Sequence, residues 1–252
     1  MPTITMLLDQ PLLAGLLILA AFLVGLSKGG LASIAMLSVP LLSIFISPLA
    51  AAALLLPIYI LSDLVGIYLY RREFSLENIK ILMPCGVLGV IIGWATASLV
   101  SDRLVALLIG IMGMAFCLYN WTKKKGRTSP APVDFKKGVF WGTLSGFTSF
   151  VAHAGGPPFQ IYTLPQKLPK MVFAGTNTLV FAVVNLAKVI PYSSIYPYTV
   201  ESFKISAILL PVAAVGTVVG KKVVEHLSEK LFFLTVQIAL FLISIKLVLT
   251  AL

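Results

Sequence analysis

The sequence predicts an all-α, polytopic integral membrane protein, and three observations support this fold class. Hydrophobic residues make up 59% of the 252 residues, and charged residues make up 11%. A soluble domain carries about 25% charged residues, so this chain has too few polar side chains to cover a core in water. Apolar runs separated by short polar loops recur along the whole chain, as expected for membrane-spanning helices. The composition therefore argues against a soluble enzyme or a nucleic-acid-binding protein.

Ten apolar runs are expected to form the helices. In chain order they cover 11–27, 30–47, 48–70, 79–99, 103–121, 138–152, 154–165, 171–190, 203–221 and 230–251. Crossing a bilayer takes about 20 helical residues, a length that 48–70, 79–99, 171–190 and 230–251 reach and that 103–121 and 203–221 nearly reach. The run at 154–165 is too short, since its helix would cover about 18 Å of a ~30 Å hydrocarbon core. Counting the interrupted segments, we expect about eight transmembrane helices.

The positions of the basic residues predict an orientation. Fourteen of the 19 Lys and Arg residues fall in four segments, namely 71–80, 122–137, 166–170 and 221–230. Because cytoplasmic loops are enriched in Lys and Arg, we expect these segments to be cytoplasmic and both termini to be outside. Only Asp9 precedes the first apolar run as a charged residue, so we expect no cleavable signal peptide.

The two halves of the chain resemble each other at an offset of about 127 residues. Pro84, Gly89 and Gly93 match Pro211, Gly216 and Gly220 in the same order. The first half is expected to start outside and the second inside, so the repeats would be inverted, as in many secondary transporters. We therefore divide the chain into a first membrane repeat (1–121), a cytoplasmic basic linker (122–137) and a second membrane repeat (138–252).

Gly- and Pro-rich interruptions occur at corresponding places in the two halves. The first is Gly25-Leu26-Ser27-Lys28-Gly29-Gly30, and the second runs from Ser149 through His153, Gly155 and Gly156 to Pro158. Broken helices leave backbone N–H groups that attract anions, and paired interruptions are the best pointer to a transport site. Two alternatives remain open, because 11–47 and 138–165 either re-enter the membrane or cross it. If they cross, Lys28 would be a cytoplasmic turn lysine and His153 would lie near the outer surface.

Few charged residues lie inside the apolar runs. A lysine at the membrane midplane is unfavourable unless it is paired or hydrated, so Lys28 is the leading candidate for balancing an anionic substrate. Asp63 is the only acidic residue within a span, and it could pair with Lys28 or Lys188, carry a proton or cap a helix. Lys188 lies near the end of its run, where snorkelling to the interface is the structural alternative.

Uncharged polar residues complete the predicted substrate site. His153 could donate to an oxyanion, carry a proton or make a structural hydrogen bond. Asn177 and Asn185 could contact substrate or bond neighbouring helices. Our predicted substrate-binding set is Ser27, Lys28, Gly29, Gly30, His153, Gly155, Gly156, Asn177 and Asn185, with Asp63 and Lys188 as a coupling or charge pair.

Several kinds of chemistry have no motif in the sequence. No Walker A pattern, no Cys or His cluster and no nucleophile with a plausible catalytic context can be found, so we expect no ATP hydrolysis, no metal, no cofactor and no enzymatic activity. The expected partners are a small anion and the lipid bilayer, with no nucleic acid. A homo-oligomer remains an open alternative.

The same residues resemble those of the sulfite exporter TauE/SafE family of membrane transporters over nearly the whole chain. The similarity includes 25–30 with Val39-Pro40-Leu41, 47–57 with Asp63, 152–158 with Tyr162 and 164–166, 175–177, and 185–188. The resemblance implies movement of small sulfur-containing anions, such as sulfite or organosulfonates, across the bacterial cytoplasmic membrane. It implies an exporter, and we expect a secondary transporter. The alternatives are an anion-selective channel, and a membrane-embedded accessory protein that carries no flux.

Overall fold

The computed structural model describes residues 9–31, 34–42, 45–46, 48–96, 102–122 and 129–251. Within these residues all regular structure is helical, which confirms the predicted all-α class. The helices of the first half are α2 (Pro11–Lys28), η1 (Ile34–Leu37), α3 (Ser38–Leu42), α4 (Pro48–Tyr70), α5 (Leu76–Ala95) and α6 (Asp102–Thr122). Those of the second half are α7 (Phe135–Ala152), α8 (Gly156–Thr163), η2 (Leu164–Gln166), α9 (Lys170–Ala187), α10 (Val189–Ile195), α11 (Val200–His226) and α12 (Glu229–Ala251).

Among the described residues, six helices are long and apolar enough to cross a membrane. They are Pro11–Lys28, Ala50–Tyr70, Leu76–Ala95, Lys170–Ala187, Val200–His226 and Lys230–Ala251. This finding confirms a polytopic membrane protein, while the count of about eight transmembrane helices stays a prediction. The first apolar region is not broken before Lys28, since α2 is a continuous helix of 18 residues, about 27 Å long.

Short helical elements follow α2 and α7 at corresponding places. The 3-10 turn η1 and the five-residue α3 come after α2, and the eight-residue α8 comes after α7. None of the three is long enough to cross a bilayer. In a membrane their backbone therefore has to be enclosed by other parts of the protein. The first five residues of α8, Gly156 to Gln160, are all buried, as this requires.

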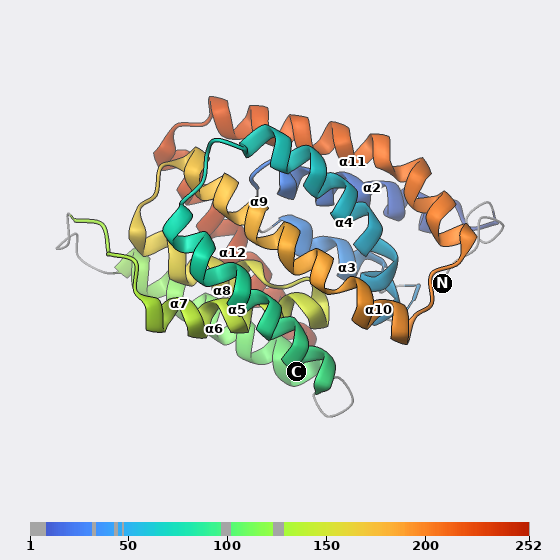
Figure 1. The fold of residues 1–252 in the computed structure, drawn as a ribbon, viewed down its shortest axis with the longest axis horizontal. Coiled ribbons are helices and arrows are strands. Elements are labelled where there is room, and N and C mark those ends of the chain that lie inside the picture. Colours follow the sequence, from blue (N-terminus) through green and yellow to red (C-terminus); the bar gives the residue numbers. More distant parts are fainter. Residues whose placement is uncertain are drawn as a thin grey trace.

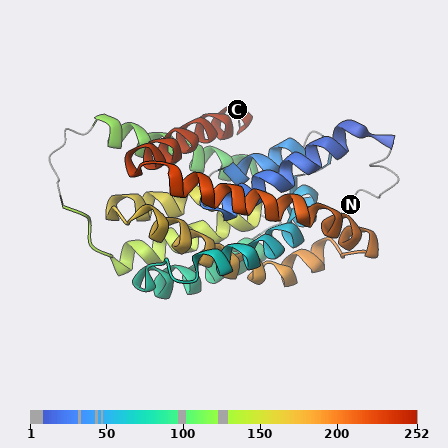
Figure 2. The same cartoon turned by 90° about the horizontal axis from the view of Figure 1, so that it is seen from above.

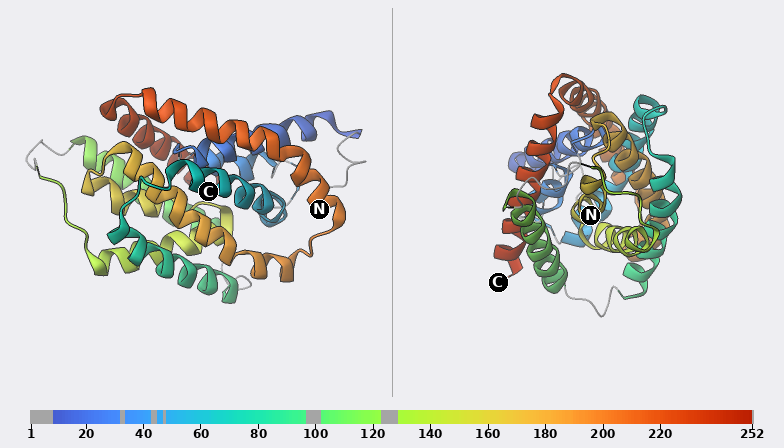
Figure 3. Two further views of the ribbon diagram at one scale, coloured as in Figure 1. Left: turned by 45° about the horizontal axis from the view of Figure 1, so that its top comes forward. Right: turned by 90° about the vertical axis from the view of Figure 1, so that its left-hand side faces the viewer.

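The long helices lie side by side along the longest axis of the molecule (Figures 1, 2 and 3). Extensive contacts join α2 with α11, α5 with α7, α6 with α12 and α4 with α9, and the pairs α4–α11 and α5–α9 are matched in extent. Exchanging α2 with α7, α4 with α9, α5 with α11 and α6 with α12 maps this set of pairs onto itself. The packing is therefore what two related halves would produce, although the inverted orientation of the repeats stays a prediction.

Glycines allow two of these helix pairs to approach closely. On α2, an added Cβ at Gly25 would collide with the carbonyl oxygen of Ala213, and one at Gly29 would collide with the carbonyl oxygen of Thr217. Gly216 and Gly220 of α11 face them in the same way. Each helix thus presents glycines four residues apart, the spacing typical of close packing in membranes. The sequence match of Gly216 and Gly220 to Gly89 and Gly93 therefore marks helix-packing positions.

Gly89 belongs to the corresponding contact in the other half. A Cβ there would collide with the carbonyl oxygen of Thr143 on α7, and a Cβ at Gly146 would collide with that of Gly86. The packing of α5 against α7 starts near the N-terminus of α7. There the Asp134 side chain accepts a hydrogen bond from the backbone N–H of Lys137. This bond lowers the pKa of the exposed Asp134 carboxyl.

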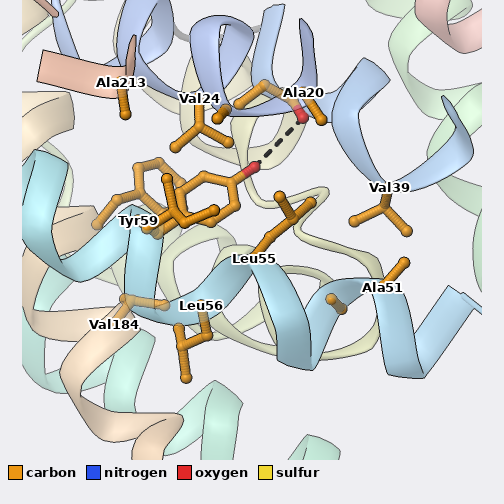
Figure 4. Packing of buried hydrophobic residues seen from close by; sticks show 14 of the residues in the cluster. Ala20, Val24, Val39, Ala51, Leu55, Leu56, Tyr59, Val184 and Ala213 are labelled. Carbon is orange, nitrogen blue, oxygen red and sulfur yellow. Dashed lines mark hydrogen bonds between the residues drawn. The ribbon is translucent and has the colours of Figure 1, made fainter. Parts of the chain in front are cut away.

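The core lies where the two halves meet and is built largely from aliphatic side chains and alanines. Figure 4 shows Tyr59 pointing from α4 into a cluster that includes Val24, Leu55 and Val184. The Tyr59 hydroxyl donates to the carbonyl of Ala35 at 3.2 Å. This tyrosine leads directly from the apolar core to the buried polar groups described next.

Candidate functional site

The two predicted interruptions meet at one small cavity inside the protein, which we call the central cavity. Its lining residues are Ser27, Lys28, Ala35, Tyr59, Ser149, His153, Gly156, Asn177, Phe181 and Asn185. The free volume is about 20 Å³, room for about one water molecule. The C-terminal ends of α2 and α7 and the N-terminal end of α8 therefore converge on a single site, which α4 and α9 complete.

A buried ion pair joins α2 to α4 at this cavity. The Nζ of Lys28 lies 2.7 Å from a carboxylate oxygen of Asp63, and the two side chains are 3% and 4% exposed. The Asn185 side chain donates to the other Asp63 oxygen at 2.7 Å. Lys28 is therefore a buried, paired lysine and not an exposed turn residue. Buried charges of this kind are stable only when paired and hydrogen-bonded, and here α2, α4 and α9 supply the partners.

Lys188 is the second buried cation. Its Nζ lies 3.1 Å from the Ser149 carbonyl oxygen, 2.9 Å from the Ser149 hydroxyl and 3.0 Å from Nδ1 of His153. The side chain is 0% exposed, so the snorkelling alternative is wrong. Lys188 stands at the junction where α9 ends at Ala187 and α10 starts at Val189. Its side chain is enclosed there and does not reach the protein surface.

His153 is held between α4 and Lys188. Its Nε2 lies 3.0 Å from the carbonyl oxygen of Ala52, and because a carbonyl only accepts, Nε2 carries the hydrogen. The ring stacks on Tyr59 with centroids 4.3 Å apart and planes at 7°. His153 is buried and ends α7 with a φ of 50°, a left-handed conformation that histidine adopts more readily than most residues. His153 is therefore enclosed by the protein, while its depth in the membrane stays a prediction.

One face of α9 supplies the remaining polar groups. Asn177, Phe181 and Asn185 are spaced by four residues and therefore point the same way. Within the described residues the Asn177 side-chain oxygen has no hydrogen-bond partner, although Asn177 is 2% exposed. A buried polar atom without a partner is typical of a position that a water or a ligand completes.

The predicted glycines play different parts from one another. Gly156 lines the central cavity, whereas Gly29, Gly30 and Gly155 do not. Gly29 allows the close contact with α11, and Gly30 has a φ of +114° that other residues rarely adopt. Gly155 lies against Phe181. The start of α8 also offers fewer backbone donors than expected, since Pro157 and Pro158 have no N–H.

The predicted site set leaves out four residues that line the cavity, namely Ala35, Tyr59, Ser149 and Phe181. Tyr59 was detectable in principle, because it lies one helical turn before Asp63 and shares its face of α4. The Nζ of Lys28 lies 5.3 Å from the Tyr59 ring centroid and 5.9 Å from that of Phe181. Both rings can stabilise a cation there.

The two polar pairs have the same spacing along the chain. Asp63 follows Lys28 by 35 residues, and Lys188 follows His153 by 35 residues. Lys28 at the end of α2 pairs with Asp63 on α4. His153 at the end of α7 pairs with Lys188 at the end of α9. The first pair contains an acid and a base, and the second contains two bases.

Comparison with known proteins points to one family. A family model described as sulfite exporter TauE/SafE matches residues 17–247. The matched range contains every residue of the central cavity. A search of curated proteins found no match.

Proposed function

The chain belongs to the sulfite exporter TauE/SafE family, and from that premise we propose that it exports small sulfur-containing anions as a secondary transporter. Its place in this family and its apolar helices make it an integral, multi-pass membrane protein. The observation that carries the proposal is the pair of buried lysines, Lys28 in the lining of the central cavity and Lys188 behind it, in contact with Ser149 and His153 of the lining. Ionisable residues buried inside membrane segments generally serve transport.

In this proposal the substrate is bound by side chains from both halves. Lys28 and Lys188 balance its negative charge, and hydroxyl and amide groups of Ser27, Asn177 and Asn185 contact its oxygens. His153 and the glycines at 155 and 156 complete the second half of the site, and Gly29 and Gly30 position the first. When an anion binds, Lys28 exchanges its ion pair with Asp63 for one with the anion.

The small size of the central cavity supports alternating access over a permanently open channel. Its free volume of about 20 Å³ holds about one water molecule and is too small for an oxyanion with four or five heavy atoms, so the site has to expand to take substrate. Rocking of one half against the other around this point would open it to each side in turn. An anion-selective channel and an accessory protein without flux are the competing functions that the experiments below distinguish.

The proposal includes an orientation of the chain in the membrane. We expect the membrane to be the bacterial cytoplasmic membrane, the basic loops to be cytoplasmic and both termini to be outside. Residues 123–128 of the linker lie outside the described residues, so the division at 1–121, 122–137 and 138–252 is proposed from the sequence. Labelling of single cysteines introduced at Lys136 and Tyr196 tests the orientation, because we expect them on opposite sides of the membrane.

The direct test of the site is flux of labelled sulfite into proteoliposomes. Lys28→Ala is expected to abolish flux, while Lys246→Ala, an exposed lysine, serves as the matched control and retains it. Because Lys28→Ala leaves Asp63 without its cation, Asn177→Leu provides a second variant. It breaks no hydrogen bond of the Asn177 oxygen within the described residues and should reduce flux without loss of folded protein. Undiminished flux in both variants contradicts the proposed site.

A further inference from the structure

We infer that the central cavity selects a monoanion over a dianion, and that Asp63 sets this valence by cancelling one of two buried lysine charges. The inference rests on the proposed function, because it takes the central cavity as the place where the transported anion is bound. It goes further by fixing the charge of the substrate. Sulfur oxyanions occur both as monoanions, such as hydrogensulfite and the organosulfonates, and as dianions, such as sulfate.

The starting point is the set of buried charges. Among the Lys, Arg, Asp and Glu side chains whose exposure the structure describes, three are buried, and they are Lys28, Asp63 and Lys188 at 3%, 3% and 0% exposure. The other titratable groups of the cavity are His153 and Tyr59. Each of the three charges lies at or next to the cavity, so their sum decides what charge the cavity can balance.

The Lys28–Asp63 pair contributes no net charge. At a separation of 2.7 Å the pair is either a cation beside an anion or, if the proton moves across, two neutral groups. The sum is zero in both cases. The amide of Asn185 donates to Asp63 and adds no charge.

The Lys188–His153 pair holds at most one positive charge. Nε2 of His153 donates to Ala52, so Nδ1 has a lone pair that accepts from Lys188 at 3.0 Å. Protonating both groups would place two cationic donors against each other at this distance. With one proton shared between them, all three acceptors around Nζ, two of them on Ser149, receive a hydrogen.

If Lys188 is neutral, the cavity still favours an anion with a single charge. It would require the Ser149 hydroxyl to turn and donate to Nζ, and the site would then take up one proton together with the anion. In either case the occupied cavity holds one positive charge to balance. A monoanion makes the occupied site neutral, whereas a dianion leaves one negative charge buried in a medium of low dielectric, which is strongly unfavourable.

Two probes of fixed charge and similar shape test this inference. Methanesulfonate carries one negative charge and sulfate carries two between pH 5 and 8, and they differ by a methyl group in place of an oxygen. Binding of each to the purified full chain is measured by ligand-induced thermal stabilisation, and each is also used to compete with labelled sulfite in proteoliposomes. For the native chain we expect methanesulfonate to bind at least about tenfold more tightly than sulfate.

Asp63→Asn is the decisive variant, because it raises the net charge of the cavity by one and should shift the preference toward sulfate by at least about tenfold. Asp134→Asn removes an exposed carboxylate outside the cavity and should leave the preference unchanged. If Asp63→Asn does not fold, the double variant Lys28→Met with Asp63→Asn keeps the net charge and should retain the preference for methanesulfonate, though with weaker binding.

The outcomes separate this inference from the proposed function. A native chain that prefers sulfate, that binds neither probe, or whose preference is the same in folded Asp63→Asn overturns the inference. A double variant that favours sulfate also overturns it. A chain that binds methanesulfonate over sulfate but moves no labelled sulfite supports the inference for the binding site and overturns the proposed transport.

Discussion

Lys188→Met should remove transport while leaving the protein about as stable as before. The substitution keeps the length of the side chain and removes a charge that is fully buried. Three hydrogen bonds of the lysine are lost, and this loss is offset because the penalty of several kcal/mol for burying the ammonium is lost as well. We therefore expect the free energy of unfolding to change by less than about 2 kcal/mol.

The effect on transport should be much larger. Losing one buried charge contact to the anion weakens its binding by about 2–5 kcal/mol, so flux at subsaturating sulfite should fall at least about thirtyfold. The assay combines thermal unfolding in detergent with labelled sulfite flux in proteoliposomes. Lys246→Met is the matched control, since that lysine is exposed near the end of α12. Native flux in Lys188→Met would refute the reasoning, and so would a large loss of stability, which would mark Lys188 as a structural residue.

Two further predictions concern helix packing and a buried amide pair. Gly216→Val should lower the free energy of unfolding by about 1–3 kcal/mol, since its side chain would meet the Phe22 carbonyl oxygen at 2.6 Å, whereas Gly15→Val, with open space around it, should change it far less. Gln166→Leu should cost about 1–3 kcal/mol, because Gln166 and Asn78 exchange two hydrogen bonds of 2.8 and 3.1 Å. Thermal unfolding measures both effects, and unchanged unfolding of either variant would contradict the packing described for it.

The apolar runs predicted where the helices lie with good accuracy. The run at 48–70 coincides with α4, and 230–251 differs from α12 by one residue. Hydrophobic length works here because a helix that crosses a membrane needs about 20 predominantly apolar residues, whether its sides face lipid or other helices. The corresponding positions of the interruptions also placed Lys28 and His153 at one cavity.

Residue identity alone could not predict which groups face each other. Lys188 resembled a lysine at a membrane surface because one straight helix was counted from 171 to 190, whereas the chain divides into α9 and α10 at that residue. Tyr192, on α10 just after this junction, is likewise buried at 0% exposure and donates to the Phe150 carbonyl. Tyr59 gave no signal in sequence beyond its helical spacing from Asp63. These contacts depend on how the helices pack, which periodicity does not specify.

Counterflow of labelled sulfite in proteoliposomes containing the native chain tests the central claim most directly. A carrier that alternates between the two sides should show saturable uptake that accelerates when unlabelled sulfite is present on the opposite side. We expect this acceleration in the native chain, and its loss in Lys28→Ala. Uptake that does not saturate and does not respond to sulfite on the other side, together with single-channel currents, would contradict it in favour of a channel. No flux at all would contradict transport itself.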